Sequence, residues 1–493
     1  MEFIRTDLQY YAPMCARHTT FTETTDTIVP DTEPDIGRIL CAFGTISVKD
    51  ELPQTDRILI SGIVHVVVLY RPDGQEGIRF LQIPLSFAHI EETQGISAEQ
   101  PCFVRCHLQR VSARAVNSRK VSVTGEIGLE IDLYQQKKTA VTEKLEADGA
   151  DLQVRYGTKP VSLLQNVLTR EYTVLDDVEV PGAQGMKLVH AQGIMLPVTC
   201  QPEHAQISLS GEVQLHLLLL DDTGKLQSMT HNVPYTQVLE APDITDNLPI
   251  TVRLALRSLD CMLREEGVLS VGVCVRALIQ QRKEQTLQTI EDLYHLKKQL
   301  EISEDSAELY DDAAPQNYQA ESMAQITLTY PATEILLTEG VCTVLDQENM
   351  KLQICVLYLD DTGNLWGEMQ DTMVPLTLGP IAYTQLRDLT VHLSTALSTE
   401  RDLQLRVSVN GTVLCGGDTA IRDITGLTAE QDREPIDKSG TTLILRYIQA
   451  PTALWDIAKQ YASTVSEIQN ANALPEHTEQ VSETMLLIPI CGR

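Results

Sequence analysis

The sequence of 493 residues predicts a mainly β fold, with three tandem β-sandwich-like repeats and a small strand–helix–helix–strand (βααβ) domain at the C-terminal end. Three observations predict this class. A β-hairpin pattern recurs three times along the chain, and in each copy an acidic turn follows an apolar strand. Residues 441–493 then change from the periodicity of strands to that of helices.

The hairpin pattern is the element that defines the repeats. In its first copy, residues 102–133, apolar side chains alternate with polar ones on both sides of a turn at 117–119. Alternation with a period of two gives each strand one apolar face and one solvated face. Two further copies surround turns at 265–267 and 398–402. The apolar positions are Cys102, Val104, Cys106, Leu108, Val121, Val123, Ile127, Leu129, Ile131, Leu133, Ile250, Val252, Leu254, Leu256, Leu269, Val271, Val273, Val275, Leu389, Val391, Leu393, Leu403, Leu405, Val407 and Val409.

A strand that ends in a tight turn precedes each hairpin. The turns are Pro72-Asp73-Gly74, Asp221-Asp222-Thr223-Gly224 and Asp360-Asp361-Thr362-Gly363. Asp and Gly are preferred in tight turns between strands, and the spacing lacks the alternate acidic ligands and distal Glu of a calcium loop. A fixed order of like pieces is typical of tandem domains. The return strand reaches a proline in every copy, at Pro84, Pro234 and Pro375.

The chain is longer than the roughly 250–300 residues at which single hydrophobic cores stop growing, so several domains are expected. Repeats and composition together predict their boundaries. We assign repeat 1 to residues 1–150, repeat 2 with an acidic connector to 151–318, a shortened repeat 3 to 319–428, a polar linker to 429–440 and the C-terminal domain to 441–493.

The connector between the second and third repeats carries two local signals. Leu287, Ile290, Leu293 and Leu296 fall at helical spacing and predict that the connector begins as a helix. The stretch 301–312 is acidic, contains no Lys or Arg, and is typical of a solvated linker.

Composition narrows the classes of partner and compartment. The net charge of −30 would repel phosphates, so we expect no nucleic-acid partner; it favours solubility or a basic partner. No stretch reaches the ~18 apolar residues of a membrane span, and residues 1–11 lack the apolar core of a signal peptide. We therefore expect a cytoplasmic protein without membrane insertion.

The eleven cysteines are scattered and form no CxxC pair. Cys102 and Cys106 would lie on one strand face about 13 Å apart, too far for a disulfide or a shared metal. We interpret the cysteines as small core residues in a reducing compartment. The chain also lacks a nucleophile elbow, a phosphate loop, an HExxH helix and a dinucleotide fingerprint. We expect no enzyme, no catalytic residue, no cofactor and no metal site.

The C-terminal tail differs in kind from the repeats. Leu443, Leu445 and Ile448 suggest a short strand, and Met485 to Ile490 a closing one. Thr464 is a favourable N-cap for a second helix. The first helix is predicted by apolar residues at i, i+3, i+4 and i+7, which are Leu454, Ile457, Ala458 and Tyr461.

This tail resembles a LysM domain, on the residues Leu454-Trp455-Asp456-Ile457-Ala458-Lys459, Tyr461, Thr464, Val465, Ile468, Asn472, Leu474 and Leu487-Ile488-Pro489. The resemblance implies a shallow groove for N-acetylglucosamine-containing glycans between two loops. This chain has Pro451-Thr452-Ala453 where the family usually has Gly-Asp-Thr or Gly-Asp-Ser, which removes a polar contact. Trp455 is either a core residue or a groove wall. The expected ligand- or partner-binding residues are Pro451, Thr452, Ala453, Trp455, Asn472 and Leu474.

The repeats resemble the SPOCS domain. The resemblance rests on Val29-Pro30-Asp31, on the stretch from Pro34 to Leu40, and on the strand from Gly62 to Tyr70; Asp292-Leu293-Tyr294 is similar to the step that follows a repeat in the family. SPOCS domains followed by a LysM domain look like the SipL-like spore-coat assembly proteins. The resemblance implies a position in the mother-cell cytoplasm at the forespore surface. It also implies a partner, the coat basement-layer ATPase, contacted through the LysM domain.

Two functions from different classes follow. The first is a non-enzymatic scaffold in spore-coat or spore-envelope assembly, which docks coat proteins through its tail and its β repeats. The alternative is a peptidoglycan-binding protein of the spore cortex or cell wall. The LysM-like tail favours the alternative, whereas the altered loop and the missing signal peptide oppose it.

Overall fold

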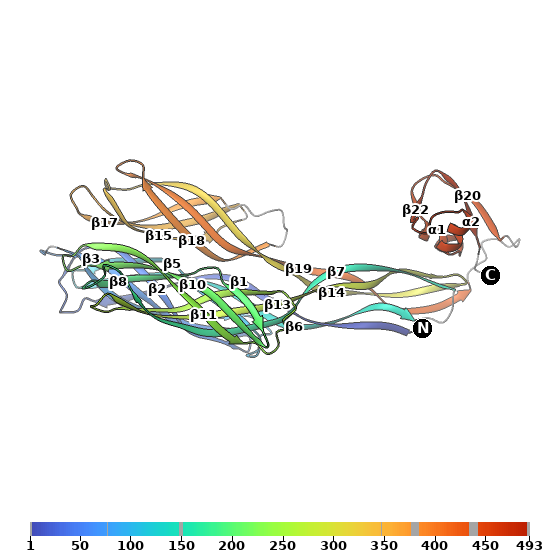
Figure 1. The fold of residues 1–493 in the computed structure, drawn as a ribbon, viewed down its shortest axis with the longest axis horizontal. Coiled ribbons are helices and arrows are strands. Elements are labelled where there is room, and N and C mark those ends of the chain that lie inside the picture. The colour runs from blue at the N-terminus through green and yellow to red at the C-terminus, as the bar shows by residue number, and fades with distance from the viewer. Residues whose placement is uncertain are drawn as a thin grey trace.

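The computed structural model describes residues 2–75, 77–146, 151–346, 348–375, 384–432 and 442–490. The predicted mainly β class is confirmed, since these residues form strands β1 to β23 and two short helices. Figure 1 shows an elongated molecule in which three β-sandwiches form a head at one end. Long strands continue from the head as a stalk, and both the N-terminus and the C-terminal domain lie at the tip of this stalk.

The same order of strands recurs three times, and each set is called a unit here. Unit 1 comprises β1 (Glu2–Ile28), β2 (Ile36–Gln54), β3 (Arg57–Pro72), β4 (Arg79–Glu92), β5 (Cys102–Asn117) and β6 (Lys120–Glu146). Unit 2 comprises β7 (Leu152–Glu179), β8 (Lys187–Met195), β9 (Thr199–Glu203), β10 (Gln206–Leu220), β11 (Leu226–Glu240), β12 (Ile250–Leu263) and β13 (Val268–His295). Unit 3 comprises β14 (Lys298–Thr327), β15 (Glu334–Val344), β16 (Asn349–Leu359), β17 (Leu365–Pro375), β18 (Thr384–Leu397) and β19 (Asp402–Asp432).

Each unit folds into a sandwich of two antiparallel sheets. One sheet is a meander, ordered β2-β3-β4, β8-β10-β11 or β15-β16-β17, and β9 pairs with β10 in addition. The other sheet contains the predicted hairpin and the first strand of the unit, and the pairings β5–β6, β12–β13 and β18–β19 confirm all three hairpins. Each sandwich buries its own apolar core between the two sheets, because alternate residues of every strand face inward.

The acidic turns lie where the sequence predicts them, between the second and third meander strands. Asp221 Oδ1 accepts the backbone N–H groups of Thr223 and Lys225, at 2.9 and 2.8 Å. Asp360 Oδ1 accepts those of Thr362 and Asn364 in the same way, at 2.9 and 2.7 Å. Both carboxylates therefore accept hydrogen bonds from the backbone of their own turn, as the tight-turn interpretation requires.

The stalk is built from the first and last strand of every unit. Its interior is one apolar cluster to which all six strands contribute, with Leu8, Tyr10, Ala12, Val141, Val161, Leu163, Leu287, Ala307, Leu309 and Ile421 buried. A second cluster closer to the tip again includes side chains from all six strands. In the stalk, the two long strands of one unit do not close a core by themselves, so the stalk depends on the three units together.

Each long pair carries the same two irregularities. At the junction of head and stalk, the first strand has an extra residue at Met14, at Gln165 or at Ala314–Pro315. Near the tip, the last strand has an extra residue at Glu143, Glu291 or Thr425. A β-bulge bends a strand and increases its twist, so these positions let two strands leave a sandwich and enter a shared stalk.

The predicted connector between units 2 and 3 is wrong. Residues 287–295 continue strand β13, and residues 301–312 lie inside strand β14, which pairs with β19. The bulge at Glu291 breaks the period of two and places Ile290 and Leu293 in one apolar cluster three residues apart. Leu287, before the bulge, is buried in the other stalk cluster, and the three together imitate the spacing of a helix. In β14 the inward positions include Ala307 and Leu309, while Glu304, Asp305 and Glu308 face solvent.

The strands consequently divide the chain at other residues than those predicted. Residues 298–318, assigned above to the second repeat, belong to the first strand of unit 3. Unit 3 is therefore not shortened, because it has the same six strands as unit 1. Residues 429–432 end β19, and residues 433–440 of the predicted linker lie outside the described residues.

The C-terminal domain has the predicted strand–helix–helix–strand order. Its elements are β20 (Leu443–Ile448), β21 (Thr452–Ala453), α1 (Leu454–Tyr461), α2 (Val465–Ala471), β22 (Gln480–Val481) and β23 (Thr484–Pro489). β20 pairs with β23, and both helices pack on one face of this small sheet. The core is apolar and comprises Ile448, Leu454, Ile457, Ala458, Ile468, Val481, Leu486 and Ile488.

Candidate docking surface of the C-terminal domain

The two helices are set by local signals that are visible in the sequence. Thr464 Oγ1 accepts the backbone N–H of Glu467 at 3.1 Å, which confirms the predicted N-cap of α2. Ala462 ends α1 in the left-handed region with φ 54°. Leu454, Ile457 and Ala458 form one face of α1 and are buried, so the opposite face, which carries Trp455 on its flank, is free to contact other parts of the molecule.

Trp455 faces the stalk tip. Its Nε1 donates a hydrogen bond to Asp292 Oδ2 at 2.7 Å. Its ring meets Tyr294 edge to face, with centroids 4.9 Å apart, and the Arg155 guanidinium lies 5.4 Å from the ring centroid. Asp292 and Tyr294 belong to β13 and Arg155 to β7, so one side chain of the tail contacts two stalk strands. Trp455 is thus half-buried, packed on the core of its own domain as one of the two interpretations had it, and also against the stalk tip, which neither interpretation included.

Asp292 connects the stalk to helix α1. Lys459 Nζ lies 2.7 and 2.9 Å from the two oxygens of this carboxylate, and the same group accepts the Trp455 N–H. Partial burial alone would raise the pKa of Asp292, but the hydrogen bonds from Lys459 and Trp455 outweigh it, and the pKa is lowered. The carboxylate is therefore held in its charged form, with both oxygens used by the C-terminal domain.

Tyr294 adds an apolar and a polar contact. Its hydroxyl donates to the backbone carbonyl of Ser463 at 2.8 Å, at the turn between α1 and α2. Tyr294 and Leu296 are buried in the same apolar cluster as the core of the C-terminal domain. The core of this domain is consequently continuous with the stalk tip.

The predicted loop residues lie together but serve mostly internal contacts. Pro451 is exposed, and Thr452 and Ala453 form strand β21, which pairs with Val481 and Gln480 of β22. This short ladder joins the two loops that would border a glycan groove. The Thr452 hydroxyl donates to the carbonyl of Ala450 at 2.9 Å, so its polar group already has a partner.

Asn472 and Leu474 are also structural. Asn472 Oδ1 accepts the N–H of Leu487 at 2.8 Å, and its Nδ2 donates to the carbonyls of Leu487 and Ile468 at 2.6 and 2.7 Å. The amide therefore closes the outer edge of β23 against α2. Leu474 is partly buried on the domain core. Of the six predicted residues, Pro451 alone is exposed.

Sequence reasoning missed an exposed apolar face on the other side of the β20–β23 sheet. Leu443, Leu445, Tyr447 and Met485 are between 47 and 60% exposed. Leu487 and Pro489, partly buried, continue the row on β23 opposite Leu445 and Leu443. The alternation in β20 predicts a strand, but its two faces are both largely apolar, so sequence alone does not tell which one meets the helices.

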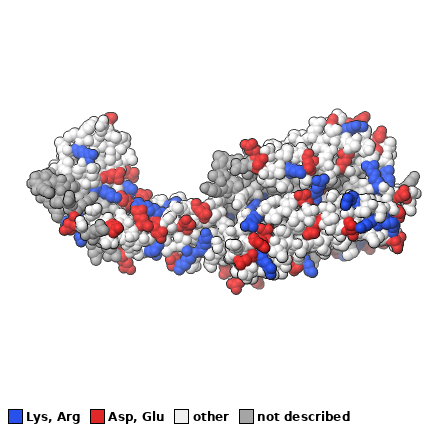
Figure 2. Space-filling model, turned by 180° about the vertical axis from the view of Figure 1, so that it is seen from behind, with Lys and Arg blue, Asp and Glu red and all other residues white. Residues whose placement is uncertain are grey.

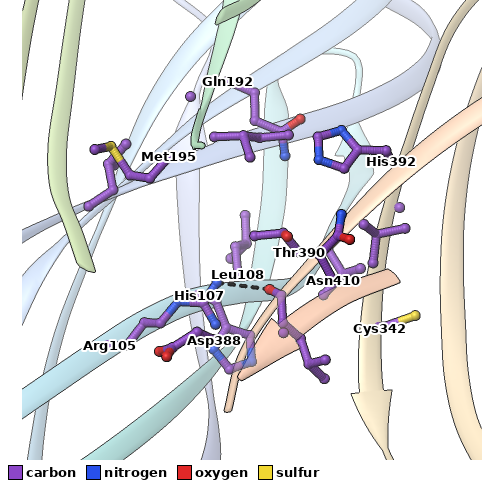
Figure 3. A pocket seen from close by; sticks show the side chains of 18 of the residues that line it. Arg105, His107, Leu108, Gln192, Met195, Cys342, Asp388, Thr390, His392 and Asn410 are labelled. Atoms are coloured by element: carbon purple, nitrogen blue, oxygen red, sulfur yellow. Dashed lines mark hydrogen bonds between the residues drawn. The ribbon is translucent and has the colours of Figure 1, made fainter. Parts of the chain in front are cut away.

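A cavity lies in the head where the three sandwiches meet (Figure 3). It measures about 800 Å³ and is lined by strands of all three units. Gln192 and His392 lie at one end of the view, whereas Arg105, His107 and Asp388 lie at the other. This cavity is mixed in character, with amide, imidazole, charged and aliphatic side chains on its wall.

Three charged side chains of this cavity, Arg105, Arg253 and Asp388, join the units. Arg253 of unit 2 contacts Asp132 of unit 1 at 2.6 Å and Asp388 of unit 3 at 2.6 and 3.0 Å. Burial alone would raise the pKa of Asp388, but the charge and hydrogen bonds of Arg253 outweigh it and lower the pKa. Arg105 donates to the Leu389 carbonyl at 2.8 Å. The cavity is therefore better described as a junction than as a ligand site.

Figure 2 shows acidic and basic side chains interspersed over head and stalk, without one large basic surface on this face. Within the described ranges, no three His, Cys, Asp or Glu side chains are arranged to hold a metal ion. None of the helices in the described part of the chain has the length and apolarity needed to span a membrane.

Comparison with known proteins yields one family. Residues 35–116 match the family model described as SipL, SPOCS domain. The match covers strands β2 to β5 of unit 1, the meander and the first strand of the hairpin. No curated protein and no solved structure matches the chain. The matched segment supports a relationship of this protein to the SipL-like family and a role connected with sporulation.

Proposed function

We propose that this protein is a non-enzymatic scaffold in spore-coat assembly, which docks coat proteins through its C-terminal domain. The match of residues 35–116 to the SipL, SPOCS domain model carries the proposal. The coat basement-layer ATPase is the proposed partner, at the forespore surface in the mother-cell cytoplasm. The protein would reach this partner with the domain at its stalk tip.

The arrangement of the molecule supports a scaffold. Three sandwiches share one stalk core, so the head and the C-terminal domain are held at opposite ends of a long body (Figure 1). A LysM-like identity of the tail is part of the proposal and is supported by its strand–helix–helix–strand order. Protein docking is favoured over glycan binding because the amides of Asn472 and Gln469 already bond to backbone groups of the same domain.

Two forms of the protein test the proposal, the full chain and a chain that ends at Asp432 and lacks the C-terminal domain. Each is immobilised and offered the purified coat ATPase and, separately, purified peptidoglycan. We expect the full chain to retain the ATPase, the shortened chain to lose it, and neither to retain peptidoglycan. Circular dichroism of the shortened chain controls for its fold. Failure of the full chain to retain the ATPase would contradict this partner.

Retention of peptidoglycan by the full chain would instead favour a cortex- or wall-binding protein. The variant Pro451→Lys sharpens this outcome, because Pro451 is exposed on the loop that a glycan would contact. Loss of peptidoglycan binding in this variant would locate the glycan in the loop. Unchanged binding would exclude that groove.

A further inference from the structure

We infer that strand β20 of the C-terminal domain pairs with β20 of a second copy of this chain, antiparallel and centred on Leu445. The inference concerns self-association and is independent of the proposed coat partner. It rests on the open edge of β20, on the apolar row that this strand exposes, and on a two-fold register in which this row meets itself and no like charges face each other.

The first argument is the direction of the backbone groups. Ile490 N–H donates to the carbonyl of Thr442, so these two residues form a hydrogen-bonded pair of the β20–β23 ladder. Antiparallel pairs alternate between bonded and non-bonded positions. The N–H and C=O groups of Leu443, Leu445 and Tyr447 therefore point away from β23.

The opposite edge of the same sheet, on β23, shows the same alternation, but its outward-pointing backbone groups are already hydrogen-bonded. Leu487 is paired with Leu445, so its backbone groups also point away from the ladder. They are bonded at 2.8 and 2.6 Å by the side chain of Asn472. On β20, in the described part of the chain, β23 is the one strand that pairs with it. Among the residues that the structure describes, one edge of the sheet is thus closed and the other is open.

The second argument is the lack of protection on this edge. The edge strands β4, β11 and β17 of the meanders carry Pro84, Pro234 and Pro375, together with charged side chains, which is the usual means of preventing edge pairing. β20 reads Leu-Ile-Leu-Arg-Tyr-Ile and contains no proline. Its one charge, on Arg446, is turned to the helices and bonded to Tyr461 and Gln460. Short apolar strands of high β propensity with little charge readily add to another strand.

The third argument selects the second copy as the occupant. With a two-fold axis at Leu445, Leu443 lies opposite Tyr447 of the other copy, and Leu445 lies opposite itself. Ile444 lies opposite Arg446, so no two like charges meet, although the chain as a whole carries a charge of −30. The apolar rows of both copies join into one face, which includes Met485 on each side. A closed two-fold contact of this kind gives a dimer and not an open chain.

Cysteine crosslinking tests both the pairing and its register in the full chain. Residues directly opposite in a bonded pair have Cα atoms about 5.5 Å apart, within the range of a disulfide. Leu445→Cys should therefore crosslink two copies on mild oxidation. Leu443→Cys alone should not, because its two copies would lie about 13 Å apart. A mixture of Leu443→Cys and Tyr447→Cys copies should crosslink again.

The wild-type chain under the same oxidation is the control for its native cysteines. Leu445→Lys provides a second measurement, by sedimentation at increasing concentration. It places two lysines opposite each other on an exposed position that does not support the fold, and should raise the dimer dissociation constant about tenfold. Monomers at every concentration, or equal crosslinking of Leu443→Cys and Leu445→Cys, would overturn the inference. Crosslinking of Leu445→Cys to a different protein and not to itself would also overturn it.

Discussion

The head and the stalk bury their apolar side chains in different ways. In the head, every unit closes a core of its own, and the three sandwiches then meet through a shared apolar cluster, a mixed cavity and buried ion pairs. In the stalk, no unit has a core of its own, and six strands share one. The difference teaches that each repeat has a core of its own at one end of the molecule, whereas at the other end the repeats share a single core.

Removal of the cation from the head junction should have the largest effect. Arg253→Met leaves Asp132 and Asp388 buried without their common partner, and the loss of one member of a buried ion pair costs about 3–5 kcal/mol. Urea unfolding followed by circular dichroism measures the loss. Arg264→Met is the matched control, because its pair with Asp177 is half-exposed and is worth about 0–1 kcal/mol. Equal losses would mean that the buried junction adds nothing.

Two core truncations compare the regions directly. Leu309→Ala in the stalk and Leu405→Ala in the head each remove a buried side chain, at a cost of about 2–5 kcal/mol. Hydrogen exchange should separate them. We expect faster exchange in all six long strands for Leu309→Ala, and in the third sandwich alone for Leu405→Ala. Faster exchange confined to β14 and β19 in the first variant would contradict a shared stalk core.

Asp423 and Asp292 follow the same short motif, Ile-x-Asp, on the last strands of units 3 and 2, yet they have different partners. Asp423 accepts the Thr142 N–H at 2.9 Å and contacts Arg5 at 2.8 Å, so it joins the stalk strands. Asp423→Asn should destabilise the stalk by about 1.5–3 kcal/mol, the usual loss for hydrogen bonds to a buried charge. Urea unfolding measures it. The fluorescence of Trp455 should not change, and a change would mean that the stalk controls the docking.

Asp292→Asn should produce the smaller and more local effect. Its partners Trp455 and Lys459 are partly exposed, so we expect a loss of about 1 kcal/mol, limited to docking of the C-terminal domain. Hydrogen exchange should become faster in α1 and remain unchanged in the stalk strands. Global destabilisation of the stalk would show that Asp292 acts like Asp423.

The docking should also depend on pH. In the folded protein, the pKa of Asp292 lies below its ordinary value of 3.8. The stabilising contribution of this carboxylate is therefore complete above about pH 4 and disappears as the pH falls through the lowered pKa. The fluorescence of Trp455 in a Trp366→Phe background reports the loss, since the chain has two tryptophans. Asp292→Asn should remove this acid transition. A transition that persists in the variant would assign it to another group.

The sequence predicts the sandwiches better than the stalk for a physical reason. In the hairpin strands of the head, one face is buried and the other is largely solvated, so residues such as Val271 and Val407 reveal the period of two. In the stalk, bulges shift that period, and the inward side chains of β14 are small or sparse. The spacing of Leu287, Ile290 and Leu293 then resembles a helix, and the solvent face of β14 resembles a linker.

The candidate site was predictable in part. Thr464 and the apolar face of α1 specify the tail from local signals. The contact of Trp455 with Asp292 joins residues far apart in the chain, and a local pattern carries no information about such a pair. The exposed face of β20 could not be identified from the sequence, because Ile444 and Leu445 are equally apolar. The packing of the helices decides which of the two side chains is covered.

Both ends of every unit lie at the stalk tip, which has a mechanical consequence. A pull between the head and the C-terminal domain enters the stalk covalently through the last strand, β19, and loads the β14–β19 ladder lengthwise. Hydrogen bonds loaded in this direction share the force and do not open one after another. The stalk should therefore behave as a stiff strut under tension, and the docking of Trp455 and Lys459 on Asp292 should yield first.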